Sequence, residues 1–247
     1  MEILGIDIGG SGIKGAPVDT ITGSLTQERH RISTPQPSTP ENVAKTVAKI
    51  VKHFRWEGAI GCTFPAVIKN GVAWSAANVD KSWIGTNGEQ LLAQVTRCPV
   101  RLLNDADAAG IAEMVFGAGK DRKGVTFILT LGTGIGSALF VDEVLLPNTE
   151  LGHLEIRGKD SEARASDSAR KRKKLNWEVW AEHVNEYLHY IEALFSPDLI
   201  ILGGGVIKKQ EKFFHLLRTQ AEIIPAQFLN DAGIVGAALA AEKLAKT

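Results

Sequence analysis

The sequence predicts an α/β fold that contains an internal duplication. Along its 247 residues, short apolar segments that end in glycine alternate with amphipathic helical segments, and one strand–turn–strand pattern occurs twice. Strands that alternate with helices form mainly parallel sheets, so we expect parallel pairing with antiparallel hairpins at the edges. The repeated pattern predicts two similar halves, each contributing one glycine turn that can hold a phosphate.

The first element is an apolar strand, Ile3-Leu4-Gly5-Ile6-Asp7-Ile8, that runs directly into a glycine cluster. Glycine allows a tight turn and presents unobstructed backbone N–H groups, which is what binding a phosphate oxygen requires. Asp7, at the end of the strand, is then placed to meet a hydrated metal ion bound to that phosphate. The alternative is a tight β-turn beside an ordinary surface aspartate.

The same plan returns 122 residues later. The matching positions are Gly10 with Gly132, Ser11 with Thr133, Gly12 with Gly134, Ile13 with Ile135 and Ala16 with Ala138. Both segments then run through apolar residues to a Val-Asp pair. A third apolar strand, at 200–202, ends in Gly203-Gly204-Gly205.

Two other nucleotide motifs do not fit the first turn. Its spacing matches the dinucleotide fingerprint, but that motif needs a helix directly after the glycines, whereas Pro17 and the turn at 22–24 predict a hairpin. The Walker pattern is absent, because Lys14 is neither preceded by Gly nor followed by Ser or Thr. A strand–glycine turn–strand clip that is used twice indicates the actin-like sugar kinase architecture.

The remaining elements follow from capping and periodicity. Thr39 is the expected N-cap of a helix with Pro40 at its first position and an apolar stripe that ends at Phe54. We expect further strands at 59–63 and 100–103, and helices at 106–116, 177–195 and 232–246. The expected domains are a smaller N-terminal one at 1–105 and a larger C-terminal one at 106–231, with the closing helix at 232–247 packing back on the first.

Composition excludes several classes of partner. Lys plus Arg and Asp plus Glu are equal at 28 each, so no overall charge favours nucleic acid or an acidic membrane surface. The two cysteines, Cys62 and Cys98, show no metal-binding or redox spacing. No apolar run reaches the ~18 residues of a membrane span, and the N-terminus opens into a strand rather than a signal peptide. We therefore expect a soluble, cytoplasmic protein that binds neither nucleic acid nor membrane.

The polar residues best suited to catalysis or ligand binding lie at the ends of strands. Asn104 and Asp105 follow the strand at 100–103, which is the usual ligand position in open α/β sheets. A carboxylate there can accept the proton of a sugar hydroxyl as it attacks a phosphoryl group. The alternative is that Asp105 only caps the next helix. Glu150 and His153 form a Glu-x-x-His pair without a third metal ligand, so we interpret them as hydrogen-bonding partners of a polyol. A lone His153 satisfied within the fold is the alternative.

These segments, in their order and spacing, resemble the ROK family of sugar kinases over nearly the whole chain. The resemblance rests on residues 7–15, 104–107, 131–136 and 150–153, and residues 34–40 and 78–83 look like the polyphosphate-using branch of the family. It implies a two-domain actin-like (ribonuclease H-like) sugar kinase fold with a cleft between the domains. The enzyme is then expected to transfer a phosphoryl group from polyphosphate, or ATP, to the 6-hydroxyl of glucose, and to form a homodimer. An ATP-dependent ROK hexokinase and a sugar-sensing ROK regulator are the alternatives, together with an actin-like ATPase that has no sugar acceptor. For a regulator, we see no room for a DNA-binding helix-turn-helix ahead of the first glycine turn.

The resemblance also implies roles for individual residues. Asp105 matches the general base, and Asp7 would hold Mg²⁺ through water. The sugar-binding positions, which include the general base, are matched by Asn78, Asn104, Asp105, Glu150 and His153. The donor phosphates would be held by Gly9, Gly10, Ser11, Gly12, Lys14, Gly132, Thr133 and Gly134. The family's adenosine turn is resembled by Gly203, Gly204 and Gly205.

One departure from the family concerns zinc. Many ROK proteins carry a cysteine-rich zinc motif after the Glu-x-x-His segment, but this chain has no cysteine beyond Cys98 and carries residues 157–174 there instead. We therefore expect no zinc, and Glu155 is our candidate for the glutamate that the zinc motif places on the sugar. The same segment contains the basic run Arg170-Lys171-Arg172-Lys173-Lys174. It is either a solvated face or a track for an anionic polymer.

Overall fold

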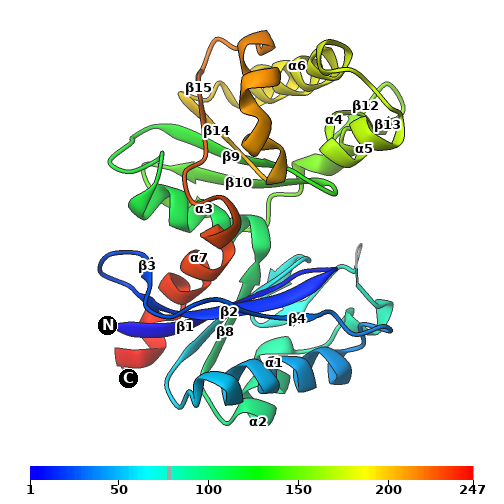
Figure 1. Cartoon of the computed structure of the whole chain (residues 1–247). Coiled ribbons are helices and arrows are strands. Elements are labelled where there is room, and N and C mark those ends of the chain that lie inside the picture. Colours follow the sequence, from blue (N-terminus) through cyan, green and yellow to red (C-terminus); the bar gives the residue numbers. More distant parts are fainter. Residues whose placement is uncertain (77–78, 247) are drawn as a thin grey trace. The chain divides into compact units, whose positions relative to one another are not determined.

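The computed structural model describes residues 1–76 and 79–246 and divides the chain into two compact units (Figure 1). Unit 1 comprises Met1–Ala112 and Asp231–Thr247, and unit 2 comprises Glu113–Asn230. The division falls within one helix, α3 (Asp105–Phe116). Each unit is built around one mixed sheet, so the predicted α/β class is confirmed. The expected predominance of parallel pairing is not found: in the described residues the two sheets contain four parallel and five antiparallel strand pairs.

The sheet of unit 1 has six strands in the order β3-β2-β1-β5-β8, with β4 also paired to β2. β1 and β2 form an antiparallel hairpin, whereas β1, β5 and β8 run parallel. The strands are β1 (Glu2–Ile8), β2 (Gly12–Asp19), β3 (Ser24–Leu25), β4 (His30–Ser33), β5 (Ile60–Phe64) and β8 (Val100–Asn104). A small hairpin of β6 (Ile68–Lys69) and β7 (Val72–Ala73) follows β5, and the remaining helices before β8 are α1 (Pro40–Phe54), η1 (Lys81–Trp83) and α2 (Gly88–Thr96).

The start of α1 confirms the capping prediction. The Thr39 hydroxyl accepts a hydrogen bond from the Asn42 amide at 3.4 Å, and Pro40 is the first helical residue. The predicted apolar stripe packs into the core of unit 1, where Val43, Val47 and Ile50 are fully buried. Local sequence signals are therefore sufficient to place this helix and its buried face.

The C-terminal helix α7 (Ala232–Ala240) lies against β1 and β5 of unit 1 (Figure 1). A Cβ atom at Gly5 would overlap the carbonyl of Ile234, and one at Gly61 would overlap that of Ala237, so glycine is required at both positions for the close approach. The predicted helix at 232–246 ends as an α-helix at Ala240 and continues as the 3₁₀ segment η6 (Glu242–Lys246).

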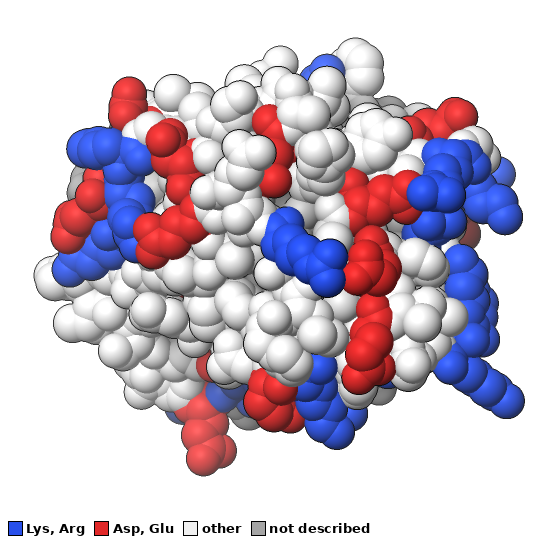
Figure 2. Space-filling model, turned by 90° about the horizontal axis from the view of Figure 1, so that it is seen from above, with Lys and Arg blue, Asp and Glu red and all other residues white. Residues whose placement is uncertain are grey.

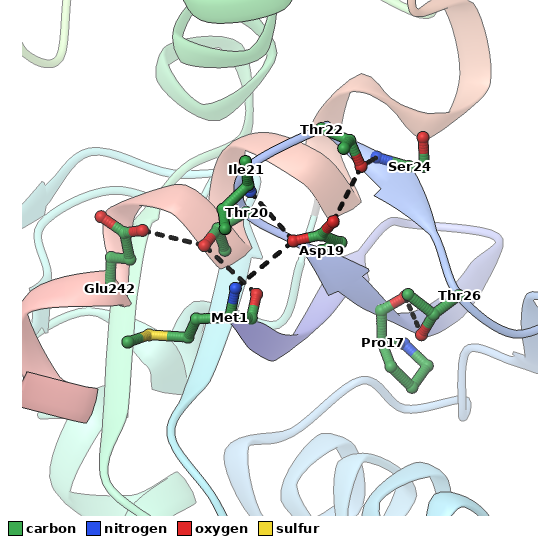
Figure 3. A network of polar contacts seen from close by, with 9 residues as sticks. All are labelled: Met1, Pro17, Asp19, Thr20, Ile21, Thr22, Ser24, Thr26 and Glu242. Atoms are coloured by element: carbon green, nitrogen blue, oxygen red, sulfur yellow. Dashed lines mark hydrogen bonds and ion pairs between the residues drawn. The ribbon is translucent and has the colours of Figure 1, made fainter.

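A polar network ties η6 to the first hairpin (Figure 3). The Thr20 hydroxyl lies 2.8 Å from the Glu242 carboxylate and 3.2 Å from the Met1 carbonyl oxygen. The N-terminal amine of Met1 donates to Asp19 at 3.3 Å. The two ends of the described chain are thus held on the same sheet.

The sheet of unit 2 has five strands in the order β11-β10-β9-β14-β15. β9–β10 and β10–β11 are antiparallel hairpins, whereas β9, β14 and β15 run parallel. Its strands are β9 (Val125–Leu131), β10 (Ile135–Val141), β11 (Val144–Leu146), β14 (Leu199–Gly203) and β15 (Glu222–Pro225). The segment between β11 and β14 contains η2 (Leu151–His153), β12 (Glu155–Ile156), β13 (Lys159–Asp160), α4 (Glu162–Ala165), α5 (Asp167–Arg172) and α6 (Trp177–Phe195). Short 3₁₀ segments complete the unit: η3 (Gly205–Lys212), η4 (Phe214–Leu216) and η5 (Leu229–Asp231).

The long helix α6 begins and ends at the predicted residues. Asn176 caps its N-terminus by accepting a hydrogen bond from the Val179 amide at 2.9 Å. Trp180, Val184 and Tyr187 from its apolar face are buried in the core of unit 2. Among the helices of the described residues, none combines the length and the apolar character that crossing a bilayer demands.

Candidate active site

The two predicted glycine turns connect equivalent hairpin strands in the two sheets. In unit 1, Ile8 pairs with Ile13, which leaves residues 9–12 in the turn, and the Gly9 amide donates to the Gly12 carbonyl at 3.1 Å. In unit 2, Leu131 pairs with Ile135, so the turn contains only residues 132–134. Here the Gly132 amide donates to the Gly134 carbonyl at 2.9 Å. The repeat found in the sequence is therefore a repeat of structure, with one extra residue in the first turn.

Asp7 lies in a row of polar side chains that crosses the sheet of unit 1. Lys14 Nζ lies 3.0 Å from Asp7 Oδ2, and the Thr63 hydroxyl donates to Asp7 Oδ1 at 2.8 Å. Gly233, in the first turn of α7, is so close that a Cβ atom there would lie 3.1 Å from the Asp7 carboxylate. The carboxylate is thus fixed on several sides, and its side chain remains 19% exposed.

The predicted catalytic pair lies where β8 meets α3. Asn104 is buried, and its Oδ1 accepts hydrogen bonds from the amides of Ala106 and Asp107 at 2.8 and 3.1 Å. Its Nδ2 donates to the Ala66 carbonyl at 3.2 Å. Asn104 therefore caps α3, and the Asp105 carboxylate is exposed at the end of the strand, with Oδ1 accepting from the Ala106 amide at 2.9 Å. The predicted sugar ligand Asn78 lies outside the described residues.

In unit 2, β10 holds the Glu-x-x-His segment beside the glycine turn. The Ser137 hydroxyl donates to the Thr149 carbonyl at 2.7 Å and accepts from the Leu151 amide at 3.0 Å. A Cβ atom at Gly152 would overlap the carbonyl of Ile135, so the glycine between Leu151 and His153 is needed for this contact. The strand that leaves the second glycine turn thus also positions Glu150 and His153.

The charges of Glu150 and His153 are perturbed by their neighbours. His153 Nδ1 lies 2.9 Å from Asp160 Oδ2, and this hydrogen bond is the main reason that the pKa of His153 is raised, with burial opposing it. Burial is the main reason that the pKa of Glu150 is raised, with the charge of Glu162 adding to the rise and His153 opposing it. The segment therefore offers a hydrogen-bond donor and acceptors close together.

Asp160 and Glu162 are the residues of this cluster that the sequence did not indicate. Glu162 Oε2 accepts a hydrogen bond from the Ile135 amide at 3.1 Å, and it lies beside Gly134. Ligand atoms of His153, Asp160 and Glu162 lie within 4.8 Å of one another, a spacing that also suits a cation. The absence of zinc therefore stays a prediction, which metal analysis of the purified protein will test.

Glu155, our sequence candidate for the additional sugar ligand, is exposed at the start of β12. It faces Asp160 across a hairpin whose two turn residues, Arg157 and Gly158, have φ values of 54° and 74°. This two-residue turn folds the chain back, so Glu162 reaches the Glu150–His153 segment. The Arg157-Gly158 dipeptide is the sequence signal from which this reversal of the chain could have been predicted.

The third glycine run ends β14, next to β9. Gly203 pairs with Thr130, and Gly204 has a φ of 87° at the entry to η3. A Cβ atom at Gly204 would press on the backbone of Leu131. The run thus lies beside the strand that leads into the second glycine turn.

The basic run offers fewer available cations than its sequence suggests. The Arg170 guanidinium stacks on Trp177 at 3.9 Å and pairs with Asp167 at 2.9 Å. Lys171 also pairs with Asp167, at 2.6 Å, and Lys173 donates to the Ala163 carbonyl at 2.8 Å. On the face shown in Figure 2, Lys and Arg side chains gather in several separate groups, with Asp and Glu beside many of them. The start of α5 nevertheless touches the second turn, because the Ser168 amide donates to the Gly132 carbonyl at 3.0 Å.

Glycine turns repeated on two α/β units, with a strand-end aspartate and a Glu-x-x-His segment, define a sugar kinase of the ROK type. The ROK family model matches residues 3–169, and the chain belongs to the ROK family. It is 50% identical to polyphosphate glucokinase of Mycobacterium tuberculosis over 238 residues, which cover 96% of this chain and 90% of the relative.

Solved structures agree with this assignment. The inorganic polyphosphate/ATP-glucomannokinase of Arthrobacter sp. strain KM matches with a TM-score of 0.93 and 48% identity, covering 96% of this chain and 97% of the other. A ROK family glucokinase from Streptomyces griseus, in complex with glucose and AMPPNP, has a TM-score of 0.81 at 23% identity and covers 100% and 99% of the two chains. The expected sugar kinase fold is thereby confirmed.

Proposed function

We propose that the protein is a polyphosphate-dependent glucokinase, which transfers the terminal phosphoryl group of inorganic polyphosphate, or of ATP, to the 6-hydroxyl of glucose. The observation that carries this proposal is the 50% identity, over nearly the whole chain, to a polyphosphate glucokinase. The similarity to a polyphosphate/ATP-glucomannokinase supports the same two donors. An ATP-dependent glucokinase is the second candidate, because the Gly203–Gly205 turn resembles the family's adenosine turn.

Asp105 is the proposed general base. Its exposed carboxylate accepts the proton of the 6-hydroxyl while that oxygen forms a bond to the terminal phosphorus. The bond from phosphorus to the bridging oxygen breaks, and its electron pair leaves with a phosphate chain that is one unit shorter. Asn104 supports this role by capping α3, because the cap fixes the backbone that carries Asp105.

Glucose is proposed to bind through Glu150, His153 and Glu162. A hexose presents hydroxyls that need both donors and acceptors, and these three side chains supply both within one small region of unit 2. Glu162 takes the place in this set that the sequence suggested for Glu155. Asn78 and Asn104 remain predicted sugar contacts from unit 1.

The proposed cofactor is Mg²⁺, held by Asp7 through water. The donor set fits, because Mg²⁺ prefers oxygen ligands and commonly uses one carboxylate together with waters and substrate phosphates. When bound, the ion neutralises charge on the donor phosphates. Lys14 holds Asp7 in place at 3.0 Å and brings a further positive charge to the same turn.

A homodimer in the cytoplasm is the proposed form of the protein, from the resemblance of the sequence to the ROK family. Sedimentation velocity of the purified protein measures the subunit number, and fractionation of the source cells measures the location. A monomer at micromolar concentration would contradict the first expectation.

A coupled assay for glucose 6-phosphate, with long-chain polyphosphate and ATP as separate donors, tests the proposed function. We expect polyphosphate to have the higher kcat/KM, and its use to fall more steeply with added salt, because a longer anion displaces more counterions. ATP as the much better donor would leave a ROK glucokinase without polyphosphate preference. No product with either donor would refute the assignment.

The basic run is tested by charge reversal. Arg170, Lys171 and Lys173 have partners within the fold, so Arg172→Glu with Lys174→Glu is the cleaner pair. We expect it to raise the KM for long polyphosphate and to spare ATP. Reversal of the exposed Lys45 and Lys49 on α1 is the matched control. Equal effects of the two pairs would reduce the run to a solvated surface.

A further inference from the structure

Arg31 in β4 faces the phosphate turn of unit 1 and has no place yet in the function. β4 pairs with β2 so that Arg31 lies directly opposite Lys14. Side chains at directly opposite positions stand on the same face of a sheet, and two like charges there destabilise the pair. Asp7 compensates Lys14, whereas no carboxylate within residues 1–76 and 79–246 forms an ion pair with Arg31.

The guanidinium of Arg31 lies on the turn itself. Its Nη2 donates to the Ser11 carbonyl at 2.9 Å, and a Cβ atom at Gly12 would lie 2.5 Å from Nε and from Nη2. Gly12 therefore leaves the space that the guanidinium occupies. The residue is exposed, and an arginine carries five N–H donors, of which the bond to Ser11 uses one.

Three of the four carbonyl oxygens of the turn are already bonded. Thr34, which follows β4, donates from its hydroxyl to the Gly9 carbonyl, while Arg31 bonds Ser11 and the Gly9 amide bonds Gly12. Bonding three carbonyls in this way lowers their repulsion of an anion above the turn. The fold thus brings together Arg31, which has no carboxylate partner among the described residues, Lys14, which is paired with Asp7, and the glycine turn at 9–12.

We propose that Arg31 binds a phosphate group of the donor next to the one held by the turn at 9–12. The chemistry that it recognises is a non-transferred phosphate, which polyphosphate and ATP both carry and which the guanidinium can grip with two parallel hydrogen bonds. An anion at this position also relieves the repulsion between Arg31 and Lys14. This inference rests on the proposed phosphoryl-transfer function and adds a donor-binding residue to it.

Arg31→Gln and Arg31→Lys test the inference. Glutamine keeps an N–H donor for the Ser11 carbonyl, so the hydrogen bond that supports the turn is retained. Lysine keeps the positive charge but lacks the planar pair of N–H donors of the guanidinium. For Arg31→Gln we expect the KM for polyphosphate and for ATP to rise about tenfold, with the glucose KM and kcat within about threefold, because the lost contact is to the donor. Arg31→Lys should fall between wild type and Arg31→Gln. Arg101→Gln, at an exposed arginine of β8 in the same unit, is the matched control.

Binding of tripolyphosphate without glucose separates this inference from the proposed function. We expect tripolyphosphate to raise the Tm of wild type and of Arg101→Gln, and to raise that of Arg31→Gln much less at the same concentration. This measurement stands even if no phosphoryl transfer is found. A donor KM within twofold of wild type, or an equal tripolyphosphate shift in all three proteins, would overturn the assignment of Arg31.

Discussion

The two glycine-turn hairpins share a backbone plan but differ in the side chains that flank the turn. In unit 1, the positions opposite one another across β2, β1 and β5 hold Lys14, Asp7 and Thr63, which form one ion pair and one hydrogen bond. The sheet therefore carries both signs of charge immediately behind its turn.

In unit 2, the corresponding positions across β10, β9 and β14 hold Gly136, Thr130 and Gly203. This row is uncharged, and the charges near the second turn come from the segment inserted between β11 and α6, through Glu150 and Glu162. Duplication therefore accounts for the glycine turn of both units, whereas charge is added separately, by the sheet itself in unit 1 and by an inserted segment in unit 2.

The largest expected effect comes from Asp105, on the charged unit. Asp105→Asn removes the proposed base and should lower kcat by roughly 10²–10⁴-fold, with the glucose KM largely unchanged. Steady-state kinetics with polyphosphate as donor measure both values. A variant that turns over within a few-fold of wild type would remove Asp105 from this role.

The comparison itself is tested by exchanging equivalent residues. Asp7→Thr gives unit 1 the side chain that unit 2 has at the same position, and it should lower kcat/KM for the donor by about 10²-fold and weaken the dependence on Mg²⁺. Thr130→Val, the matched change in unit 2, should stay within about threefold of wild type because Thr130 belongs to the uncharged row. Similar losses in both variants would show that the two rows are not functionally different.

The insertion in unit 2 should control glucose rather than the donor. Glu150→Gln and His153→Ala should each raise the glucose KM by about 10- to 100-fold, since a hydrogen bond to a charged group contributes about 1.5–3 kcal/mol. Burial and Glu162 raise the pKa of Glu150, so the wild-type glucose KM should also rise as the pH falls towards that raised value. A loss of affinity for the phosphate donor instead would show that this segment binds the donor and not glucose.

The smallest expected effect concerns Asp160, which acts through His153. Asp160→Asn should lower the pKa of His153 towards its ordinary value and raise the glucose KM by about threefold, in keeping with an exposed pair. The pKa of His153 is raised in the folded protein, so its charged form stabilises the fold fully below about pH 6.5, and this stabilisation is lost as the pH rises through the raised pKa. NMR titration of the His153 ring follows this shift, and an unchanged pKa would contradict the role given to Asp160.

Local signals in the sequence predicted much of the fold. The cap and stripe of α1, both ends of α6 and the repeated turns depend on neighbours within a few residues, and these were confirmed. The closing helix was predicted too long, because its change to a 3₁₀ segment after Ala240 has no marker in its alanine-rich sequence.

The site was harder to predict, because its contacts join residues that no motif connects. Glu162 reaches the Glu150–His153 segment only after the chain reverses at Arg157 and Gly158. The sequence offered Asp105 as the cap of the next helix, but the side chain that caps α3 is that of Asn104. Arg170 looked like part of a charged surface, but its partner, Trp177, lies beyond the end of α5.

The packing of α7 on β1 and β5 also affects how the protein is made. A ribosome releases the strands of unit 1 first, but the helix that covers Gly5 and Gly61 is translated only after all of unit 2. Unit 2 is continuous in the chain and can therefore fold before α7 has been translated and has packed on the sheet of unit 1. A chain that stops before Ala232 would leave the central strands of that sheet exposed on one face. We expect such a chain to bind chaperones and to be inactive.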